Sequence, residues 1–595
     1  MNMTDLIKEA YIDPIRSVMV VDDEYPTLSK LILGQDTSEP HDKNRLHDVV
    51  QVCRLPENNW MLDVHDGQFT GTGDVDNLHH SDLLILDYHL EGTGDDGKGL
   101  KSLSVLSTLA KKEHFNLVIV HTKGYADIGG DEGYRAVFKD IVFHLQQEKT
   151  FLELPEKLLT QVINAIDFWD EEQSGILESL IDSVADLDYL KLLALNCSPM
   201  KIETEKNELL GLKVIYDSRP MGEDEILDRL NFKLLLWYIL IQKGNKLRDE
   251  FGFEYFGDLQ WSYDNTSLWV KAGNLFVVVV VGKGTSTAEL PIKLLGALEH
   301  WCPHPHRMLL AKLRHKLDEH GFSFASDMLD KKHVQAGWLR ELLKCQPHEL
   351  EGKSWLTAQN HLEEFSSRYK GDLSRFLADT VRSLTDSGRD LKEIEQQYSK
   401  SDVLENEYDI FKSVNAFNNA IFFDGWHLTT GHILSDISKN LYLVVTPACD
   451  LVPGRSKHKK IDIVVQRLYP ISSALKKDSD TTKLKEEDLF NRCKELVNSK
   501  QLVFLSIDGV VDVYASTSKP FNNANPSLMS LAIANDGILN AENKVLAYNL
   551  NLSLTPPQVR SCEYEIVGQL RYEYALHHSK TSGEHVSRIG LDYHG

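Results

Sequence analysis

The sequence predicts a multidomain protein of the α/β plus α+β class, and three observations support this. From Ser17 to about Thr150, short apolar runs alternate with helical patterns, which is typical of a doubly wound parallel sheet. Residues 151–250 then carry apolar side chains at helical spacing, which predicts a helical middle. From about Ala416 the chain changes to short strand-like runs, which predicts a β-rich C-terminal domain in the form of a half-barrel or small barrel. With 595 residues, the chain is long enough for several domains.

These changes in the pattern of apolar residues divide the chain into five regions. The hairpin in the fourth region is expected from the β-branched runs 266–270 and 275–281, which flank a turn containing glycine. The predicted regions are an N-terminal arm (1–15), a parallel-sheet domain (16–150), a helical region (151–250), a hairpin followed by helices (251–405) and a β-rich domain (406–595).

Composition narrows the class of protein. The formal net charge of −25 repels a phosphate backbone, so general nucleic-acid binding is disfavoured. The seven cysteines are odd in number and scattered, which favours a reducing compartment over a disulfide framework. The longest apolar runs are too short to span a bilayer, and the N-terminus lacks the pattern of a signal peptide. We therefore expect a cytoplasmic protein without a membrane segment.

Three apolar runs in the N-terminal region end in polar residues. Each run is short and bounded, as expected for a strand buried on both faces of a parallel sheet. Functional sites in such sheets form beyond the carboxyl ends of the strands, so the polar residues should meet at one edge. The runs and the residues that follow them are Val18–Val21 with Asp22 and Asp23, Leu83–Leu86 with Asp87, and Leu117–Val120 with Thr122.

Clustered carboxylates at this edge suit a phosphoryl-transfer site that depends on Mg²⁺, a hard cation that prefers oxygen ligands. Asp22 and Asp23 are expected to hold the metal with Asp87, and the backbone carbonyl of His89 is a further candidate ligand. Asp87 stands alone at the end of the middle run and is the candidate nucleophile, which would form an acyl phosphate. The hydroxyl of Thr122 is expected to hydrogen-bond a phosphoryl oxygen.

The same residues carry a family resemblance. Val20-Val21-Asp22-Asp23-Glu24 resembles the acidic-pair strand of response-regulator receiver domains. The run Asp82–Asp87, followed by Gly92 and Asp96-Gly97, is similar to their phosphoacceptor strand and loop, and Leu117–Thr122 is similar to their switch strand. The resemblance covers about a quarter of the chain. It implies a receiver-like fold that takes a phosphoryl group on Asp87.

Two features depart from the receiver pattern. Receivers carry a lysine after their last strand, usually followed by proline, but the candidate Lys139 is followed by Asp140. Lys123 is a rival for this role. Phe138 directly precedes Lys139, whereas the switch aromatic of receivers usually lies further back.

The resemblance also implies partners and a biological setting. A receiver is phosphorylated by a sensor histidine kinase and normally controls an output region. The 445 residues that follow residue 150 show no convincing catalytic set or DNA-reading helix. A receiver fused to such a region resembles the receiver component of bacterial defensive two-component systems against phage. This implies a regulator or phosphate buffer that limits a second, effector-bearing regulator.

Other interpretations of the protein's function remain open. One is a phosphorylation-gated enzyme with an active site near Cys449, for which His427, His432 or His458 would supply the base. Another is a phosphorylation-dependent scaffold, and a transcription factor is a weaker alternative. The segment Gly282-Lys283-Gly284-Thr285 lacks the full Walker spacing and is interpreted as a hairpin exit.

Overall fold

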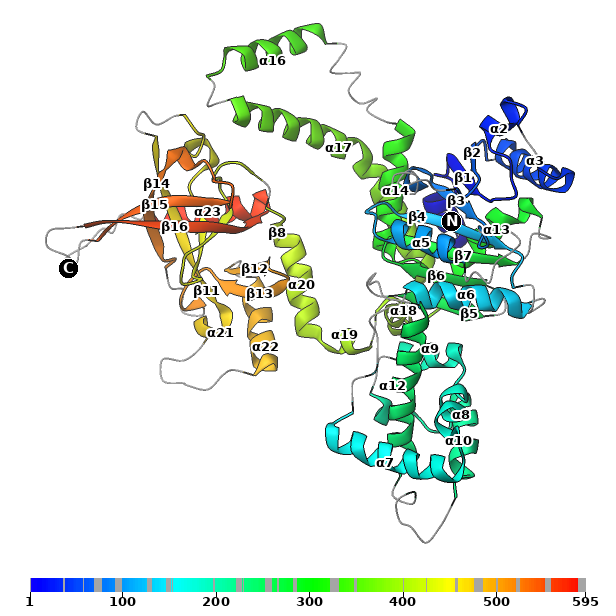
Figure 1. Cartoon of the computed structure of the whole chain (residues 1–595). Coiled ribbons are helices and arrows are strands. Elements are labelled where there is room, and N and C mark those ends of the chain that lie inside the picture. Colours follow the sequence, from blue (N-terminus) through cyan, green and yellow to red (C-terminus); the bar gives the residue numbers. More distant parts are fainter. Residues whose placement is uncertain are drawn as a thin grey trace, which may run out of the picture. The chain divides into compact units, whose positions relative to one another are not determined.

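The computed structural model divides into two compact units, residues 1–319 with 373–383 and residues 320–372 with 384–595 (Figure 1). Each unit is described separately. The structure describes residues 2–586 apart from 36–37, 57, 69–77, 91–98, 126–130, 146–150, 152–153, 196–197, 221–226, 228–229, 252–258, 265–266, 282–285, 321–330, 347–349, 400, 424, 455–458, 476–484, 499–500, 521–524 and 552–557.

The N-terminal unit is built on a seven-stranded sheet with the order β2-β1-β3-β4-β7-β6-β5. The strands from β2 to β7 in this order are parallel, and β6 and β5 continue the sheet as antiparallel strands. The strands are β1 (Ser17–Val21), β2 (Met61–His65), β3 (Leu83–Leu86), β4 (Asn116–Thr122), β5 (Gln260–Asp264), β6 (Ser267–Ala272) and β7 (Leu275–Val281).

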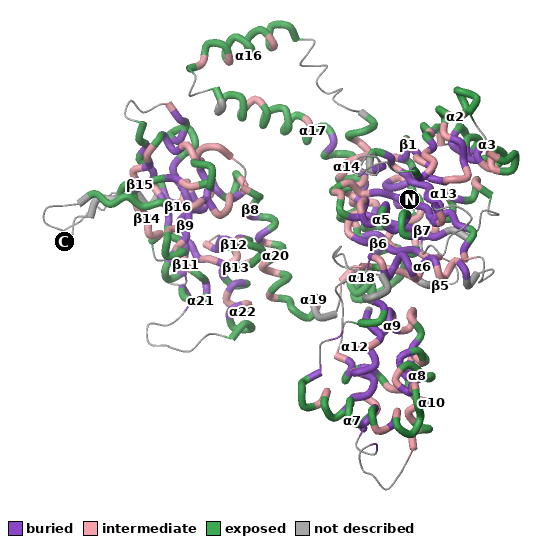
Figure 2. The backbone as a smooth tube through the Cα atoms, viewed as in Figure 1, coloured by how far each residue is buried: buried purple, intermediate pink, exposed green. Residues whose placement is uncertain are grey.

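Both faces of this sheet are buried, as Figure 2 shows. Successive side chains of a strand point to opposite faces. In β3, accordingly, Leu84 and Leu86 join one apolar cluster, whereas Leu83 and Ile85 join the other. The first cluster includes side chains of α5 (Leu100–Ala110) and α6 (Asp131–Leu145), and the second includes side chains of α1 (Met3–Ile7), α3 (Pro40–Arg54) and α13 (Leu290–Trp301). The predicted doubly wound sheet is confirmed.

The helical middle is also present. Its apolar faces extend the first cluster, with Trp169 and Leu236 fully buried. Its helices are α7 (Glu156–Glu172), α8 (Ile176–Asp182), α9 (Asp186–Ala194), α10 (Leu210–Asp217) and α12 (Phe232–Phe251). Further helices of the N-terminal unit are α2 (Leu28–Ile32), the π-helix η1 (Lys8–Ile12) and α14 (Pro305–His320).

The expected hairpin is present, and its second strand also joins the parallel sheet. The two expected runs form β6 and β7, but β7 pairs in parallel with β4, with Thr122 opposite Val281. The last parallel strand therefore comes from residues 275–281, and the sheet does not end at the predicted boundary of residue 150. The helical middle is an insertion between the fourth and fifth parallel strands.

The C-terminal unit contains a nine-stranded antiparallel sheet. Six of its strands form a closed ring, because the order β10-β9-β16-β15-β14-β11 is completed by a pairing of β10 with β11. The expected half-barrel or small barrel is thus a closed ring, which β13 and β12 extend. The strands are β8 (Ala420–Ile421), β9 (His432–Ser435), β10 (Leu441–Val444), β11 (Lys460–Pro470), β12 (Leu502–Ile507), β13 (Val510–Ala515), β14 (Leu528–Ala534), β15 (Lys544–Asn551) and β16 (Gln558–Leu570).

Helices flank this sheet and precede it. Helix α17 (Leu350–Thr385) contributes to both units, because its residues 373–383 belong to the N-terminal unit. The other helices of the C-terminal unit are α16 (Lys332–Lys344), α18 (Leu391–Tyr398), α19 (Ser401–Glu405), α20 (Glu407–Asn419), α21 (Ile471–Ala474), α22 (Glu486–Val497) and α23 (Tyr572–Val586). In the described part of the chain, no helix is long and apolar enough to cross a membrane.

Candidate functional site

The polar residues predicted to converge do so at the carboxyl edge of the N-terminal sheet. Val21, the last residue of β1, lies opposite Leu86, the last residue of β3. Asp22 and Asp87 directly follow this pair, and the Asp87 N–H donates to the carbonyl of Val21 at 2.8 Å. The parallel register therefore places the two aspartates side by side.

Asp22, Asp23 and Asp87 form an acidic cluster. Each offers a carboxylate oxygen, and these oxygens all lie within 4.8 Å of one another. Asp22 and Asp87 are only 4% and 5% exposed. Like charges at this spacing repel unless a cation neutralises them. Three carboxylates are the oxygen donors that Mg²⁺ prefers, so these residues fit that ion. Within the described residues, this is the one cluster of metal-ligating side chains with such spacing.

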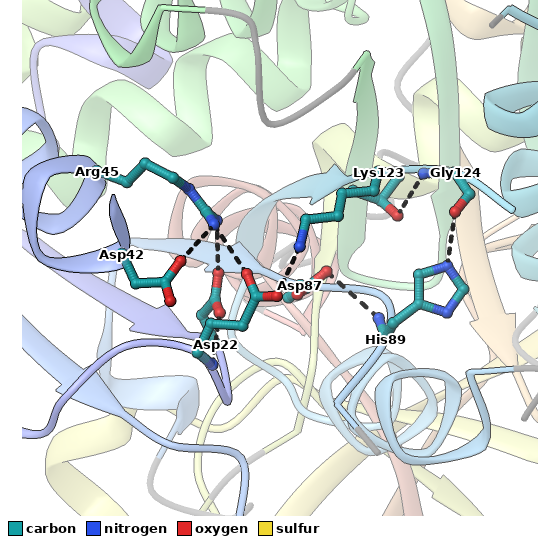
Figure 3. A network of polar contacts seen from close by, with 9 residues as sticks. Asp22, Asp42, Arg45, Asp87, His89, Lys123 and Gly124 are labelled. Carbon is teal, nitrogen blue, oxygen red and sulfur yellow. Dashed lines mark hydrogen bonds and ion pairs between the residues drawn. The ribbon is translucent and has the colours of Figure 1, made fainter. Parts of the chain in front are cut away.

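The backbone around Asp87 is held by short-range hydrogen bonds. The His89 N–H donates to Asp87 Oδ1 at 3.3 Å, and His89 Nε2 lies 3.1 Å from the carbonyl oxygen of Gly124. Ser102 Oγ donates to the carbonyls of Asp87 and Tyr88, each at 2.9 Å. His89 therefore lies beside the cluster and connects the turn after β3 to the turn after β4 (Figure 3).

Thr122 is fully buried as the last residue of β4, the strand next to β3. Its Oγ1 accepts a hydrogen bond from the Gly124 N–H at 3.1 Å. A threonine hydroxyl that accepts in this way keeps its own proton for donation. Thr122 therefore lies at the carboxyl edge of the sheet, and its contact with a phosphoryl oxygen stays a prediction.

The structure does not bring Lys139 to the cluster. Lys139 lies in α6, and its Nζ is 3.2 Å from Asp186 Oδ2 in α9 and 3.9 Å from Asp140 Oδ1. Asp186 also pairs with the buried Lys243 at 2.6 Å. Burial raises the pKa of Asp186, but the hydrogen bond and charge of Lys243, together with Lys139, outweigh it and lower that pKa overall. Lys139 therefore ties α6 to the helical insertion.

Lys123, the rival lysine, lies nearer to the acidic cluster. Its Nζ is 2.6 Å from Glu24 Oε1, and Glu24 follows the acidic pair after β1. The ion pair joins the turn after β1 to the residue directly after β4. Because Glu24 already binds its ammonium group, Lys123 would have to exchange partners to contact a phosphoryl group.

Arg45 is the cation that the sequence did not reveal. It comes from α3, yet its guanidinium lies 2.8 Å from Glu24 Oε2, 3.0 Å from Asp42 Oδ1 and 3.5 Å from Asp22 Oδ2. Burial opposes its charge, but the hydrogen bond to Glu24 and the neighbouring acidic groups raise the pKa of Arg45 overall. In Figure 3, Arg45 and Lys123 reach the acidic residues from two sides. Nothing in the local sequence of α3 marks this arginine.

Two tyrosines connect the site to α6. Both hydroxyls hydrogen-bond Asp140 Oδ2, that of Tyr88 at 3.2 Å, and the hydroxyls of Tyr88 and Tyr125 lie 3.4 Å apart. Burial and the charge of Asp140 raise the pKa of Tyr88. Phe138, the aromatic noted in the sequence, is instead a fully buried core residue. The aromatic side chains next to Asp87 and shortly after Thr122 are therefore Tyr88 and Tyr125.

The residues of the alternative site near Cys449 differ from one another in exposure and have their own hydrogen-bond partners. Cys449 is exposed, and its Sγ donates to Asp450 Oδ1 at 3.6 Å. His432 is buried, and its Nδ1 accepts the Thr429 N–H at 3.2 Å. Burial lowers the pKa of His432 to about 3, so this side chain is neutral near pH 7. His458, Gly92, Asp96, Gly97 and the segment 282–285 lie outside the described residues.

Comparison with known proteins identifies the N-terminal region. Residues 14–127 match the family model of the response receiver domain. No curated protein and no solved structure matches the chain. Receiver domains accept a phosphoryl group on an aspartate in signalling, are typically phosphorylated by histidine kinases, and typically bind Mg²⁺ through an acidic cluster such as the one described above. The matched region contains β1 to β4 and ends before β7.

Proposed function

From the receiver domain at residues 14–127, we propose that this protein is a response regulator whose phosphoacceptor is Asp87. The observation that carries the proposal is the cluster of Asp22, Asp23 and Asp87, with oxygens within 4.8 Å of one another. Asp22, Asp23, Asp87 and the carbonyl of His89 would hold Mg²⁺. The ion would neutralise charge on the phosphoryl oxygens and carboxylates.

The chemistry of the chain's own residues follows from this arrangement. A carboxylate oxygen of Asp87 attacks the phosphorus of the donor and forms an acyl phosphate. The bond from phosphorus to the donor breaks, and the donor leaves with the bonding electron pair. When the donor is a sensor histidine kinase, the broken bond is the phosphorus–nitrogen bond of phosphohistidine. The hydroxyl of Thr122 donates to an oxygen of the transferred group.

The lysine of this site requires a new candidate, because the last parallel strand is β7. In the sequence, Lys283 follows Val281, the final residue of β7, by two positions. The pairing of Val281 with Thr122 supports the choice of a residue after β7, although Lys283 itself lies outside the described residues. We therefore assign the role of the receiver lysine to Lys283, with Lys123 as its rival.

The proposal is tested by intact mass spectrometry of the full chain after incubation with acetyl phosphate and Mg²⁺. We expect a mass gain of one phosphoryl group, which EDTA and the variant Asp87→Asn each abolish. Asp82→Asn is the matched control, because Asp82 directly precedes β3 whereas Asp87 directly follows it. Equal labelling of wild type and Asp87→Asn would refute the assignment.

The biological setting is a finer part of the proposal. The family resemblance supports a cytoplasmic regulator or phosphate buffer in anti-phage signalling that limits a second, effector-bearing regulator. A purified phosphorylated kinase, mixed with both receivers, tests this idea. We expect addition of this chain to lower phosphorylation of the second receiver, and Asp87→Asn to remove that effect. Unchanged phosphorylation with the wild-type chain would contradict the buffer role.

A further inference from the structure

Helix α3 places the largely buried, positively charged side chain of Arg45 beside the acidic cluster. Arg45 directly precedes Leu46, whose side chain packs into the second core cluster and holds α3 against the sheet. The Arg45 side chain is only 10% exposed, and its guanidinium lies 5.1 Å from the centre of the Tyr25 ring. This confinement keeps the charge close to the carboxylates that follow β1.

The contacts of Arg45 include one carboxylate of the acidic cluster itself. Its Nη1 lies 2.8 Å from Glu24 Oε2 and 3.0 Å from Asp42 Oδ1, and these residues are outside the three-carboxylate cluster. Its Nη2 lies 3.5 Å from Asp22 Oδ2, and the other oxygen of Asp22 accepts the Glu24 N–H at 3.0 Å. Arg45 and a bound divalent cation would therefore use the same carboxylate.

We propose that Arg45 is a positioning residue that competes with Mg²⁺ for Asp22 and thereby weakens metal binding. This inference rests on the proposed function of the cluster. Two cations that share one buried carboxylate repel each other, and this repulsion is strong where water is excluded. The longer contact to Asp22 is the one that a metal would displace, whereas Glu24 and Asp42 retain Arg45 at the rim.

The competition has a consequence for α3. Without metal, Arg45 links α3 to Asp22 and partly neutralises the acidic cluster. With metal bound, that link is lost and α3 is held at this end by Arg45 through Glu24 and Asp42. Binding of the metal, which precedes phosphorylation, thus changes the contacts of α3, although α3 contributes no metal ligand to the cluster.

The test is isothermal titration of Mg²⁺ into the full chain, with wild type, Arg45→Met, Arg45→Lys and the control Arg54→Met. Arg54 lies at the other end of α3 and is exposed. We expect Arg45→Met to bind Mg²⁺ about tenfold more tightly, equivalent to about 1.4 kcal/mol. Arg45→Lys keeps the charge and should change the affinity less, and Arg54→Met should leave it unchanged.

A second measurement guards against loss of fold. The melting temperature of Arg45→Met without metal should fall, because the acidic cluster loses its counter-charge, and the increase caused by Mg²⁺ should exceed that of wild type. Equal or weaker Mg²⁺ binding by folded Arg45→Met would overturn the inference. If the wild-type chain still labels with acetyl phosphate, the proposed function survives this result. If the wild type neither binds Mg²⁺ nor labels, both proposals fail.

Discussion

Asp82 and Asp87 lie at opposite ends of the same strand, β3, and their surroundings differ. Asp82 accepts hydrogen bonds from the backbone N–H groups of Arg16 and Ser17, both at 3.0 Å, and from Ser17 Oγ at 2.9 Å. Its other oxygen binds Arg314 Nη2 at 2.6 Å. Asp87 instead lies among carboxylates, with the His89 N–H at 3.3 Å from its Oδ1.

This difference separates a structural carboxylate from a reactive one. Donors fixed in the fold satisfy the charge of Asp82, so it anchors β1, β3 and α14 to one another. The carboxylates of Asp22 and Asp23 add negative charge beside Asp87, and a bound cation would reduce the repulsion among the three groups. Arg314 and backbone donors therefore neutralise Asp82 at the amino edge of the sheet. At the carboxyl edge, Arg45 and Lys123 lie beside a cluster of three carboxylates that suits a further cation.

The largest expected effect is on the rate of phosphoryl labelling, and it concerns the cations that pair with Asp82 and Asp87 at the two ends of β3. Arg314 is already bound to Asp82, whereas Lys283 is the residue that we propose as the cation for a phosphoryl group on Asp87. Loss of a charge-assisted hydrogen bond costs about 1.5–3 kcal/mol, so Lys283→Met should slow labelling by acetyl phosphate about 10- to 100-fold. Time-resolved mass spectrometry measures this rate, with Lys139→Met as the control. A slow Lys123→Met variant beside a normal Lys283→Met variant would assign the role to Lys123.

A smaller effect is expected on stability, with different responses at the two ends of β3. Asp82→Asn removes a charge-assisted acceptor from Arg314 and should lower the free energy of unfolding by about 1–3 kcal/mol. Asp87→Asn removes a repelling charge and should leave that free energy unchanged or raise it. Urea unfolding of the two full-length variants without metal measures both values. If Asp87→Asn destabilised the chain as much as Asp82→Asn, the distinction between these aspartates would be lost.

Asp186 is a third aspartate to compare with Asp82 and Asp87. Its substitution should have the smallest effect on the free energy of unfolding. Burial raises its pKa, but Lys243 and Lys139 lower it overall, as they favour the charged form. Because the folded pKa lies below the unfolded value near 4, the resulting stability is present above that value and is lost as pH falls through the folded pKa. Asp186→Asn should therefore cost about 1 kcal/mol at pH 7, after allowance for solvent screening.

The pH dependence of this difference is the check on Asp186. Urea unfolding of wild type and Asp186→Asn should give curves that separate at pH 7 and approach each other between about pH 5 and pH 3. A difference that stayed constant over this range would show that the charge of Asp186 does not contribute. The contribution of Asp186 would then have to come from packing or from hydrogen bonds that do not depend on its charge.

Much of the candidate site was predictable, because its residues directly follow apolar runs. The runs that became β1, β3 and β4 are short, and parallel pairing brings their carboxyl ends to one edge. Arg45 was not predictable in this way, since it reaches Asp22 through the packing of α3. Lys139 was chosen because the sequence gives no local indication that β7, far along the chain, is the partner of β4.

In the C-terminal unit, too, the features that depend on tertiary contacts could not be predicted from the sequence. The runs of β10, β12 and β13 are rich in β-branched or aromatic residues and were expected as strands. Strand β14 has the sequence Leu-Met-Ser-Leu-Ala-Ile-Ala, whose leucine and alanine content gives little indication of a strand. The ring closes through the pairing of β10 with β11. This pairing depends on tertiary contacts, so the sequence did not decide between a small barrel and a half-barrel.

The position of β7 has a consequence for biosynthesis. Roughly 150 residues separate the end of β4 from the start of β7, so a ribosome adding about 5–20 residues per second needs about 8–30 s to make that stretch. Throughout this interval the nascent chain presents β4 as an apolar edge that awaits its neighbour. The helical insertion is made before the strand that completes the sheet, so folding of the insertion decides how soon β7 reaches β4. During this interval the unpaired edge of β4 can pair with other chains, which favours aggregation.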